Sequence, residues 1–216
     1  MSDEPKVSMD LKIIILGNSG TGKTTLCKKW TGEERESIKP TIVSEYSTKI
    51  FPYNDKNYRI QLWDIGGQDK STAIAKVFSK DSHGCILVSD VNNNQSLEDS
   101  IGWKSTIEDD CKFVDGEKIP FLLLRNKIDT IKSEKEKESL EKETKIFSEE
   151  NEFDLYGLTS ALEDINVQES INSFVEHIIN RLNQYLSKGK IISDRDTIKI
   201  RRNSGIRRKK LDKKCC

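Results

Sequence analysis

The segment GNSGTGKT, residues 17–24, constrains the fold of this chain more than any other. It fits the pattern G-x-x-x-x-G-K-[ST], follows the apolar run LKIIIL and precedes a helical pattern. In that order the glycines let the backbone curl, so that its N–H groups and the helix N-terminus face phosphate oxygens. Lys23 would add a positive charge at the β- and γ-phosphates, and the Thr24 hydroxyl would bind Mg²⁺. The pattern predicts phosphate binding but does not say which nucleotide is bound.

Apolar runs of strand length alternate with helical patterns along the 216 residues. The expected strands are LKIIILG, two strands around an Asn-Asp turn within residues 46–64, GCILVSDV and IPFLLLRNKID. The expected helices lie within residues 94–114, 133–152 and 165–186. This alternation predicts a three-layer α/β fold with a mostly parallel sheet, in which ligands bind at the carboxyl ends of the strands.

Within two of these helices, the residues expected to face the core share a helical spacing. They are Leu97, Ile101, Ile107 and Phe113 in the first helix, and Ile171, Phe174, Val175, Ile178, Ile179 and Leu182 in the last. The segment 133–152 is rich in charge, and its only apolar seam is Leu140 with Ile146 and Phe147. Its Glu/Lys spacing favours an exposed surface helix over a nucleic-acid or partner surface.

Length and composition predict one globular domain. With 34% hydrophobic and 33% charged residues, 216 residues can bury one core but are few for two domains. No stretch approaches the roughly 18 apolar residues of a membrane span, and MSDEPKVSMD lacks the apolar stretch of a secretion signal, so we expect a cytosolic protein. Cys27, Cys85 and Cys111 have no CxxC or Cys/His spacing, which favours small buried side chains over a disulfide framework or a zinc site.

The zero net charge conceals a basic tail on an acidic body. Residues 185–216 carry 12 Lys+Arg against 3 Asp+Glu, a net of +9, so residues 1–184 carry 24 against 33, a net of −9. Such a run is typical of a solvated segment, and nucleic acid or an anionic membrane are the alternatives that involve a partner. The tail ends in Cys215 and Cys216, and adjacent cysteines rarely meet the geometry of an unstrained disulfide.

A second motif, NKID at residues 126–129, follows the apolar run FLLLR. Asp129 can accept both N–H donors on the edge of guanine, an edge that adenine lacks. Asn126 can tie this loop to the phosphate loop, and Lys127 contributes a long aliphatic stem. Alone, the string is more often a turn, but paired with the phosphate loop about 100 residues upstream it indicates guanine binding.

Residues 11–186 resemble a small GTPase of the Ras superfamily, and several strings are similar to the Rab branch. They are PTIVSEY (40–46), RIQLWDIGGQD (59–69), CILVSDVNNNQSLED (85–99), NKID and TSA (159–161). The resemblance implies a P-loop GTPase fold with a mostly parallel six-stranded sheet, one antiparallel edge strand and about five helices. It also implies a short flexible N-terminus (1–10) and a disordered basic tail (187–216).

The resemblance assigns roles to single residues. Thr41, with Thr24 and Asp64, would hold Mg²⁺, and the Gly67 N–H would touch the γ-phosphate. Gln68 would position the attacking water, as the corresponding glutamine does in Ras, so that Gln68, Lys23 and Thr41 are the expected catalytic residues. The full expected set for GTP or GDP is Gly17, Asn18, Ser19, Gly20, Thr21, Gly22, Lys23, Thr24, Thr25, Thr41, Asp64, Gly67, Asn126, Lys127, Asp129, Ser160, Ala161 and Leu162.

The resemblance also implies partners. Ile42 and the aromatic residues Tyr46, Trp63 and Phe78 would face effectors, because two of these aromatics flank segments whose order depends on the γ-phosphate. An exchange factor, an activating protein that supplies arginine in trans, a prenylation escort and a GDP-dissociation inhibitor are expected, but no nucleic acid. Cys215 and Cys216 would both carry geranylgeranyl chains, since two chains anchor firmly where one is marginal. The protein would lie on the cytoplasmic face of an intracellular membrane, with a cytosolic pool.

Several positions depart from the family pattern. TGEERESIKP (31–40) lacks the aromatic residue that usually stacks on guanine, which predicts fast nucleotide release unless Arg35 covers the ring. Leu162 stands where lysine is usual, and Arg125 stands where glycine is common. Gly66 and Asp69 make their string similar to the Arf branch, yet the chain begins Met-Ser rather than Met-Gly.

Three alternatives stay open at this point. They are a nucleoside or nucleotide kinase, a nucleotide-binding module with negligible hydrolysis, and a nucleic-acid-binding tail.

Overall fold

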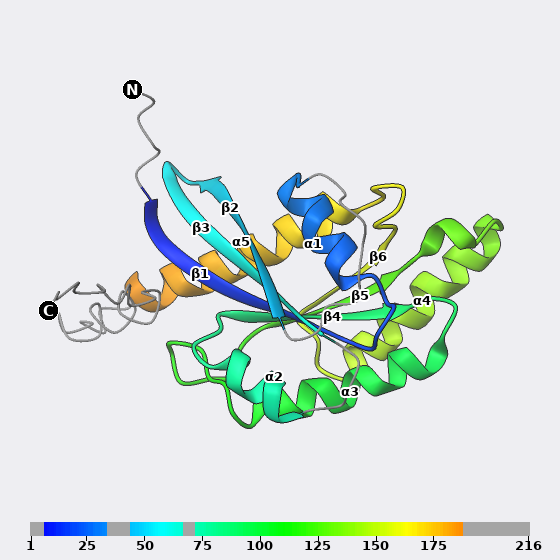
Figure 1. Cartoon of the computed structure of the whole chain (residues 1–216), viewed down its shortest axis with the longest axis horizontal. Helices are drawn as coiled ribbons and strands as arrows, with labels where there is room; N and C mark the ends of the chain where they lie inside the picture. The colour runs from blue at the N-terminus through cyan, green and yellow to red at the C-terminus, as the bar shows by residue number, and fades with distance from the viewer. Residues whose placement is uncertain (1–6, 34–43, 67–71, 188–216) are drawn as a thin grey trace, which may run out of the picture.

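The computed structural model describes residues 7–33, 44–66 and 72–187 (Figure 1). The strands are β1 (Val7–Leu16), β2 (Ser44–Tyr53), β3 (Lys56–Ile65), β4 (Gly84–Asp90), β5 (Phe121–Asn126) and β6 (Leu155–Thr159). The helices are α1 (Lys23–Thr31), α2 (Thr72–Ser79), α3 (Asn94–Glu108), α4 (Glu134–Glu150) and α5 (Val167–Ser187), with a short 3₁₀ helix, η1 (Ile128–Thr130). Among these described helices, none is both long and apolar enough to cross a membrane.

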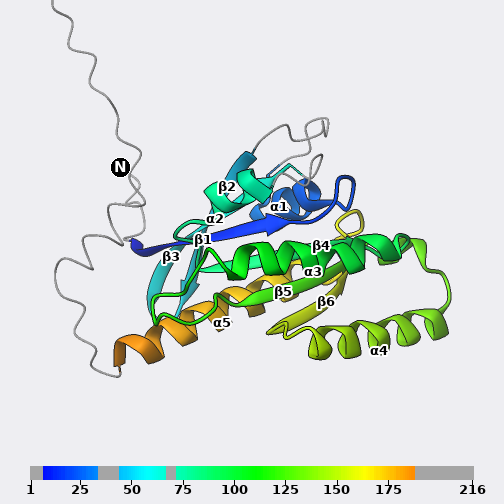
Figure 2. The ribbon, with the colours of Figure 1, turned by 90° about the horizontal axis from the view of Figure 1, so that it is seen from below.

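The six strands form one sheet in the order β2-β3-β1-β4-β5-β6, and β2 with β3 is its antiparallel pair. Helices α1 and α5 cover one face, and α2 and α3 cover the other (Figure 1). Figure 2 shows α4 alongside β6, at the edge of the sheet opposite β2 and β3. The architecture predicted from the sequence is therefore confirmed, including the antiparallel edge strand.

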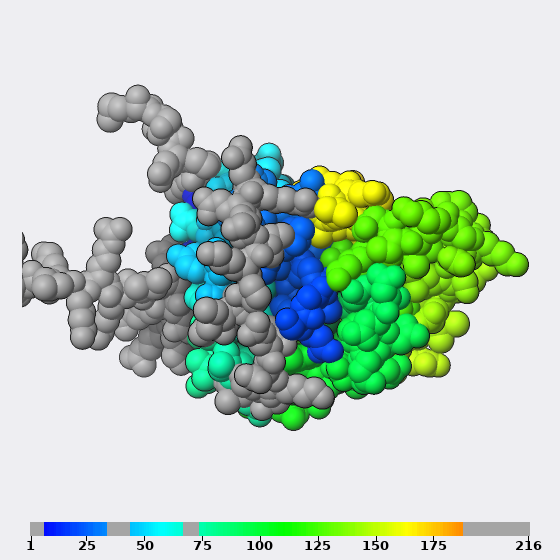
Figure 3. All heavy atoms as spheres, turned by 45° about the vertical axis from the view of Figure 1, so that its right-hand side comes forward, coloured from blue at the N-terminus to red at the C-terminus, as the bar shows by residue number. Residues whose placement is uncertain are grey.

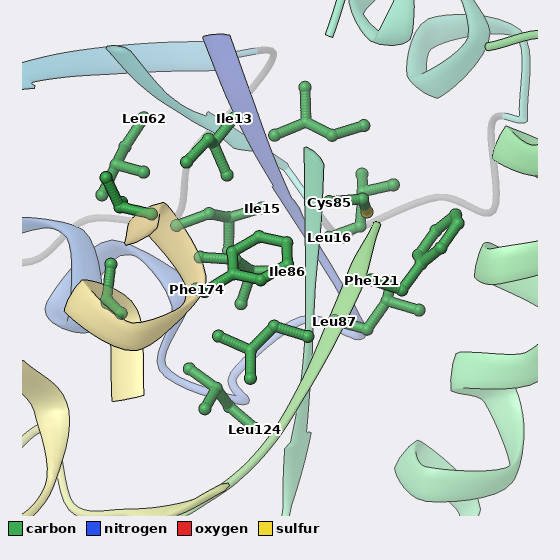
Figure 4. Close-up of a cluster of buried hydrophobic side chains, with 14 of the residues drawn as sticks. Ile13, Ile15, Leu16, Leu62, Cys85, Ile86, Leu87, Phe121, Leu124 and Phe174 are labelled. Carbon is green, nitrogen blue, oxygen red and sulfur yellow. The ribbon is translucent and has the colours of Figure 1, made fainter. Parts of the chain in front are cut away.

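The centre of the sheet is apolar on both faces, as expected for strands covered by helices on each side. The last four residues of β1 and all of β5 are buried. Figure 4 shows Phe174 of α5 against Ile15 and Ile86 on one face, while Cys85 and Phe121 point to the other. Burial of Cys27, Cys85 and Cys111 confirms the prediction for these thiols.

The first strand begins earlier than the sequence suggested. Val7 to Asp10, assigned above to a flexible N-terminus, belong to β1 and pair with β3 from Asn57 to Arg59. The segment VSMD has no apolar run that would predict a strand. It nevertheless pairs with β3, which is itself held in a hairpin with β2, and this pairing extends the sheet. That hairpin turns at Asn54 and Asp55, whose φ values of 48° and 58° suit the tight turn predicted there.

The buried face of α5 is the predicted one, because all six expected residues have at most 1% of their surface exposed. The prediction for α3 is partly wrong, since the helix ends at Glu108 and Phe113 is buried in the following loop. Ile101 is 37% exposed and Trp103 is buried in its place. The inward face of α3 therefore follows the line of Leu97, Ser100, Trp103, Lys104 and Ile107.

Helix α4 is the exposed surface helix that the charge spacing predicted. Its seam differs from the prediction, because Ile146 is 54% exposed while Thr144 and Ser148 are buried. Phe147 stacks on Phe153, two residues before β6, with ring centroids 6.4 Å apart. One residue along a helix is a rotation of about 100°, so Ile146 points away from the face that Phe147 uses.

Candidate functional site

The predicted site residues gather at one end of the sheet. The phosphate loop follows β1, Asp64 is the second-last residue of β3, Asn126 ends β5, and Ser160 follows β6. These four strands are parallel to one another in the sheet, so their carboxyl ends share one edge. In Figure 3 the phosphate loop and α1, in blue, reach the surface beside the segment after β6, in yellow. Segments far apart in the sequence thereby form one candidate site.

Two glycines in the phosphate loop have no room for a side chain. Gly17 has φ of 138°, and a Cβ there would lie 2.2 Å from the carbonyl oxygen of Val88. Gly22 has φ of 99°, and its Cβ would lie 2.3 Å from Nδ2 of Asn126. Both positions therefore need glycine for its backbone conformation and for the close approach of a neighbouring element.

Lys23 begins α1 and turns its ammonium group back into the loop. Its Nζ donates to the carbonyl oxygens of Gly17 at 2.8 Å and Asn18 at 3.0 Å. Burial lowers the pKa of Lys23, because the charged form loses solvation, and the nearby carboxylate of Asp64 partly opposes this. A desolvated cation inside a loop of amide groups suits phosphate oxygens.

The Thr24 hydroxyl donates a hydrogen bond to the carboxylate of Asp64. Asp64 is buried, with 3% of its surface exposed, so β3 delivers this charge directly beneath the phosphate loop. Hydroxyl and carboxylate oxygens are hard ligands of the kind that Mg²⁺ prefers. The donor set formed by Thr24 and Asp64 therefore fits the predicted metal.

Asn126 joins three loops through its side chain. Its Nδ2 donates to the Thr21 carbonyl oxygen at 2.9 Å, which confirms the predicted tie to the phosphate loop. Its Oδ1 accepts from the Ala161 N–H at 3.0 Å and from the Thr159 hydroxyl at 3.2 Å. With 1% of its surface exposed, Asn126 is a buried hub that sets the phosphate loop, the guanine motif and the loop after β6 relative to one another.

The remaining guanine-motif residues are held by partners from neighbouring strands. Ser160 Oγ donates to Oδ1 of Asp129 at 2.5 Å. Lys127 has φ of 75° and forms an ion pair with Asp90 at the end of β4, with Nζ 2.7 Å from Oδ2. Burial alone would raise the pKa of Asp90, but hydrogen bonds from Lys127 and Asn92 outweigh it and lower that pKa.

The other predicted residues lie around this framework. Thr25 is half-buried in α1, Ser19 and Gly20 are exposed at the tip of the phosphate loop, and Leu162 is 61% exposed beyond Ala161. The Ala161 N–H faces Asn126 in this structure, so its contact with a guanine oxygen stays a prediction. Six predicted residues lie outside the described residues: Thr41, Ile42, Gly67, Gln68, Cys215 and Cys216.

Some positioning residues were missed by the sequence reasoning. Nδ2 of Asn18 donates to Oδ2 of Asp99 at 2.6 Å, and Trp103 Nε1 donates to Oδ1 of Asn18 at 3.3 Å. These contacts tie the phosphate loop to α3 across more than 80 residues of sequence, and no local pattern marks them. The sequence did offer a pattern that could have identified Asp90, because it is the polar residue that ends an apolar strand.

The three aromatic residues predicted to face effectors do form a cluster. The ring centroids of Tyr46 and Trp63 are 5.0 Å apart, and those of Trp63 and Phe78 are 5.8 Å apart. Tyr46 is 49% exposed, and the neighbouring α2 exposes Val77 to 65%. The cluster is therefore accessible from solvent rather than sealed in the core.

Comparison with known proteins identifies the family. The protein-family model described as Ras family matches residues 12–180 of this chain. The chain belongs to the Ras family. This Ras-family protein is 35% identical to the Ypt/Rab-type GTPase ypt7 of Schizosaccharomyces pombe over 164 residues, which cover 76% of this chain and 79% of the relative.

Two further relatives agree with this assignment. The GTP-binding protein yptV5 of Volvox carteri is 35% identical over 159 residues, covering 73% of this chain and 77% of the relative. The Ras-related protein Rab-7L1 of Rattus norvegicus is 29% identical over 171 residues, covering 78% of this chain and 82% of the relative. The Ras-family protein is thus a Rab-like small GTPase, which binds and hydrolyses GTP.

Proposed function

We propose that this Rab-like GTPase is a Mg²⁺-dependent switch that regulates membrane trafficking from the cytoplasmic face of an intracellular membrane. The observation that carries the proposal is the hydrogen bonding of Asn126, which assembles the phosphate loop, the guanine motif and the loop after β6 into one site. Residues 7–187, from the start of β1 to the end of α5, are the switch domain, and residues 188–216 are the tail that carries the lipids on Cys215 and Cys216.

In the proposed site, the loop N–H groups of residues 17–22 and Lys23 hold the β- and γ-phosphates, while Asp129 accepts the N–H donors of guanine. Thr24, Asp64 and Thr41 would hold Mg²⁺, which neutralises charge on the phosphate oxygens when bound. Gln68 orients a water whose oxygen bonds to the γ-phosphorus, while the bond from that phosphorus to the β–γ bridging oxygen breaks. The products are GDP and inorganic phosphate.

Partners follow from the same assignment. The cluster of Tyr46, Trp63 and Phe78, with Ile42, is the proposed effector surface, which would be read when the GTP form orders the adjoining segments. An activating protein supplies arginine in trans and raises a slow intrinsic rate. An exchange factor, a prenylation escort and a GDP-dissociation inhibitor complete the cycle. The protein bound to the GDP-dissociation inhibitor forms the cytosolic pool. Rapid nucleotide release was predicted from residues 31–40, of which residues 34–40 lie outside the described residues, and it stays a prediction.

The proposal predicts that membrane association depends on the bound nucleotide. In cells, tagged full-length Gln68→Leu should accumulate on one set of membranes, because hydrolysis no longer ends the GTP state. Thr24→Asn should be diffuse or differently placed, because it weakens the Mg²⁺ and nucleotide site. The measurement is fluorescence distribution together with intact mass, which should show two geranylgeranyl chains.

The matched control is the Gln68→Leu chain with Cys215→Ser and Cys216→Ser, which should lose membrane association while still binding GTP. Identical diffuse distributions for Gln68→Leu and Thr24→Asn would count against a nucleotide-gated membrane switch. An intact mass without lipid, in cells that prenylate other proteins, would count against the anchor.

A further inference from the structure

Arg125 is a buried arginine that directly precedes the proposed guanine motif in the chain. It is the residue before Asn126 in β5, and 1% of its surface is exposed. Its backbone pairs with Ser89 of β4 on one side and Leu158 of β6 on the other. Where the family pattern has glycine, this chain therefore places a long cationic side chain inside the protein.

The guanidinium group is paired with side chains from two helices. Nη1 donates to Oε1 of Glu143 in α4 at 2.8 Å, and Nη2 donates to Oδ1 of Asn94, the first residue of α3, at 3.4 Å. Nε is buried without a hydrogen-bond partner. Because a buried cation is strongly unfavourable unless it is paired, the position of Glu143 restricts where the end of β5 can lie.

The ion pair reaches from the interior to the surface. The Glu143 side chain is 55% exposed, whereas the Arg125 side chain is 1% exposed. Loss of the carboxylate would leave the buried arginine without its charged partner, which favours a shift of β5 or α4 that lets water reach the guanidinium group. The residue that moves with Arg125 is Asn126, whose side chain holds Thr21 and Ala161. Asp129 follows three residues later in η1.

We propose that Arg125 is a positioning residue for guanine recognition, acting through its ion pair with Glu143 and its hydrogen bond to Asn94. The inference rests on the proposed nucleotide site. In this arrangement α3 and α4 hold the end of β5 so that Asp129 presents its carboxylate to the N–H donors of the base. The alternative is that the pair only stabilises the fold, in which case base selectivity would not depend on it.

The test uses the full-length protein and compares binding of GDP with binding of inosine diphosphate. Hypoxanthine keeps the N1–H of guanine but lacks its 2-amino group, so the affinity ratio reports the second of the two donors that Asp129 accepts. A hydrogen bond to a charged group corresponds to about tenfold or more in affinity, which sets the expected GDP preference of the unaltered protein. Glu143→Gln should reduce that preference by about fivefold or more, because the affinity for GDP falls further than the affinity for inosine diphosphate.

Glu141→Gln is the matched control, because it makes the same chemical change on an exposed residue of α4 that lines the groove beside β6. It should leave the ratio unchanged. Arg125→Lys keeps the charge but loses the two-pronged donor, and it should give an intermediate ratio. Arg125→Met tests the residue directly, and Glu143→Gln keeps the test available if that variant does not fold.

The outcomes separate the inference from the proposed function. If Glu143→Gln weakens both nucleotides equally, or lowers only the melting temperature, Arg125 is structural and the inference is overturned. An equal effect of Glu141→Gln would also overturn it. If the unaltered protein shows no preference for GDP over inosine diphosphate, the proposed guanine site itself fails.

Discussion

At the scale of single residues, His83 shows how a fold can hold a titratable group neutral. It precedes β4, is partly buried and packs edge-on against Phe113. Its Nδ1 accepts the Lys12 N–H at 3.1 Å, so a proton on that nitrogen would break the contact. Burial lowers the pKa of His83 to about 4, although the Asp81 carboxylate opposes the shift.

The protein should therefore lose stability as the pH falls from 6.5 to about 4. The pKa of His83 is lower in the folded chain than in the unfolded chain, so the unfolded state binds the proton first. The stabilisation is fully present above pH 6.5 and declines below it, by at most roughly 3 kcal/mol for the difference between 6.5 and about 4. Urea unfolding at several pH values measures this slope.

His83→Asn is the informative variant, because its side-chain oxygen can still accept the Lys12 N–H but does not titrate. The slope between pH 4 and 6.5 should flatten in this variant. An unchanged slope would mean that other groups cause the acid sensitivity.

At the scale of elements, α1, β2 and α5 meet at a polar junction. Lys49 of β2 donates to the Trp30 carbonyl oxygen at 2.7 Å and to Oε1 of Gln168 at 3.0 Å. Its Nζ also lies 4.5 Å from the centre of the Trp30 ring. The Trp30 indole N–H donates to Oδ1 of Asn172 in α5 at 2.9 Å. Lys49 thus brings a positive charge to the C-terminal end of α1, where the helix dipole favours a cation.

Lys49→Met should lower the free energy of unfolding by about 1–3 kcal/mol. The substitution keeps the apolar stem but removes the hydrogen bond to the α1 carbonyl and the contact with the indole ring. Chemical denaturation measures the change. Lys56→Met, at the exposed first residue of β3, should change stability little. Equal effects of the two substitutions would show that the junction adds nothing specific.

At the scale of the whole molecule, the close contact between sheet and helix layers depends on a small residue. Gly84 begins β4, and a Cβ there would lie 2.6 Å from Cδ1 of Ile178 and 3.0 Å from Cζ of Phe174 in α5. Gly102 in α3 has no atom within 4 Å of such a Cβ, and it is exposed. The two glycines thus report different effects, one on layer packing and one on helix propensity.

Opposite results are expected for alanine at these two positions. Gly84→Ala should destabilise the protein by about 1–3 kcal/mol, because the added methyl group pushes α5 away from the sheet. Gly102→Ala should stabilise it by about 0.5–1 kcal/mol, because alanine restricts the unfolded chain and favours the helix. Thermal unfolding of both variants distinguishes the effects. A neutral Gly84→Ala would show that Ile178 and Phe174 reorient at little cost.

Local rules explain why the sequence predicted so much of this site. The turn at Gly17 and Gly22, the helix that begins at Lys23 and the apolar strands before the loops each depend on neighbouring residues. The same reasoning was less accurate for α3 and α4, where Ile101 and Ile146 have a helical spacing but face solvent. Which face of a helix is buried depends on what it packs against, so spacing alone cannot decide between two partly apolar faces.

By itself, the sequence determined the order of the motifs along the chain, with the predicted phosphate loop first, the aspartate expected to bind metal next and the predicted guanine motif later. Only the tertiary structure decided which side chains hold these parts together. Asn126 reaches Thr21 across 105 residues, and Arg125 reaches Glu143 and Asn94 across 18 and 31. The physical reason is that such contacts depend on where parallel strands end and helices pack, which no short stretch of sequence encodes. The same reason applies to Arg125. An arginine in place of the usual glycine affects the neighbouring loop only because its side chain is buried and paired with residues of α3 and α4.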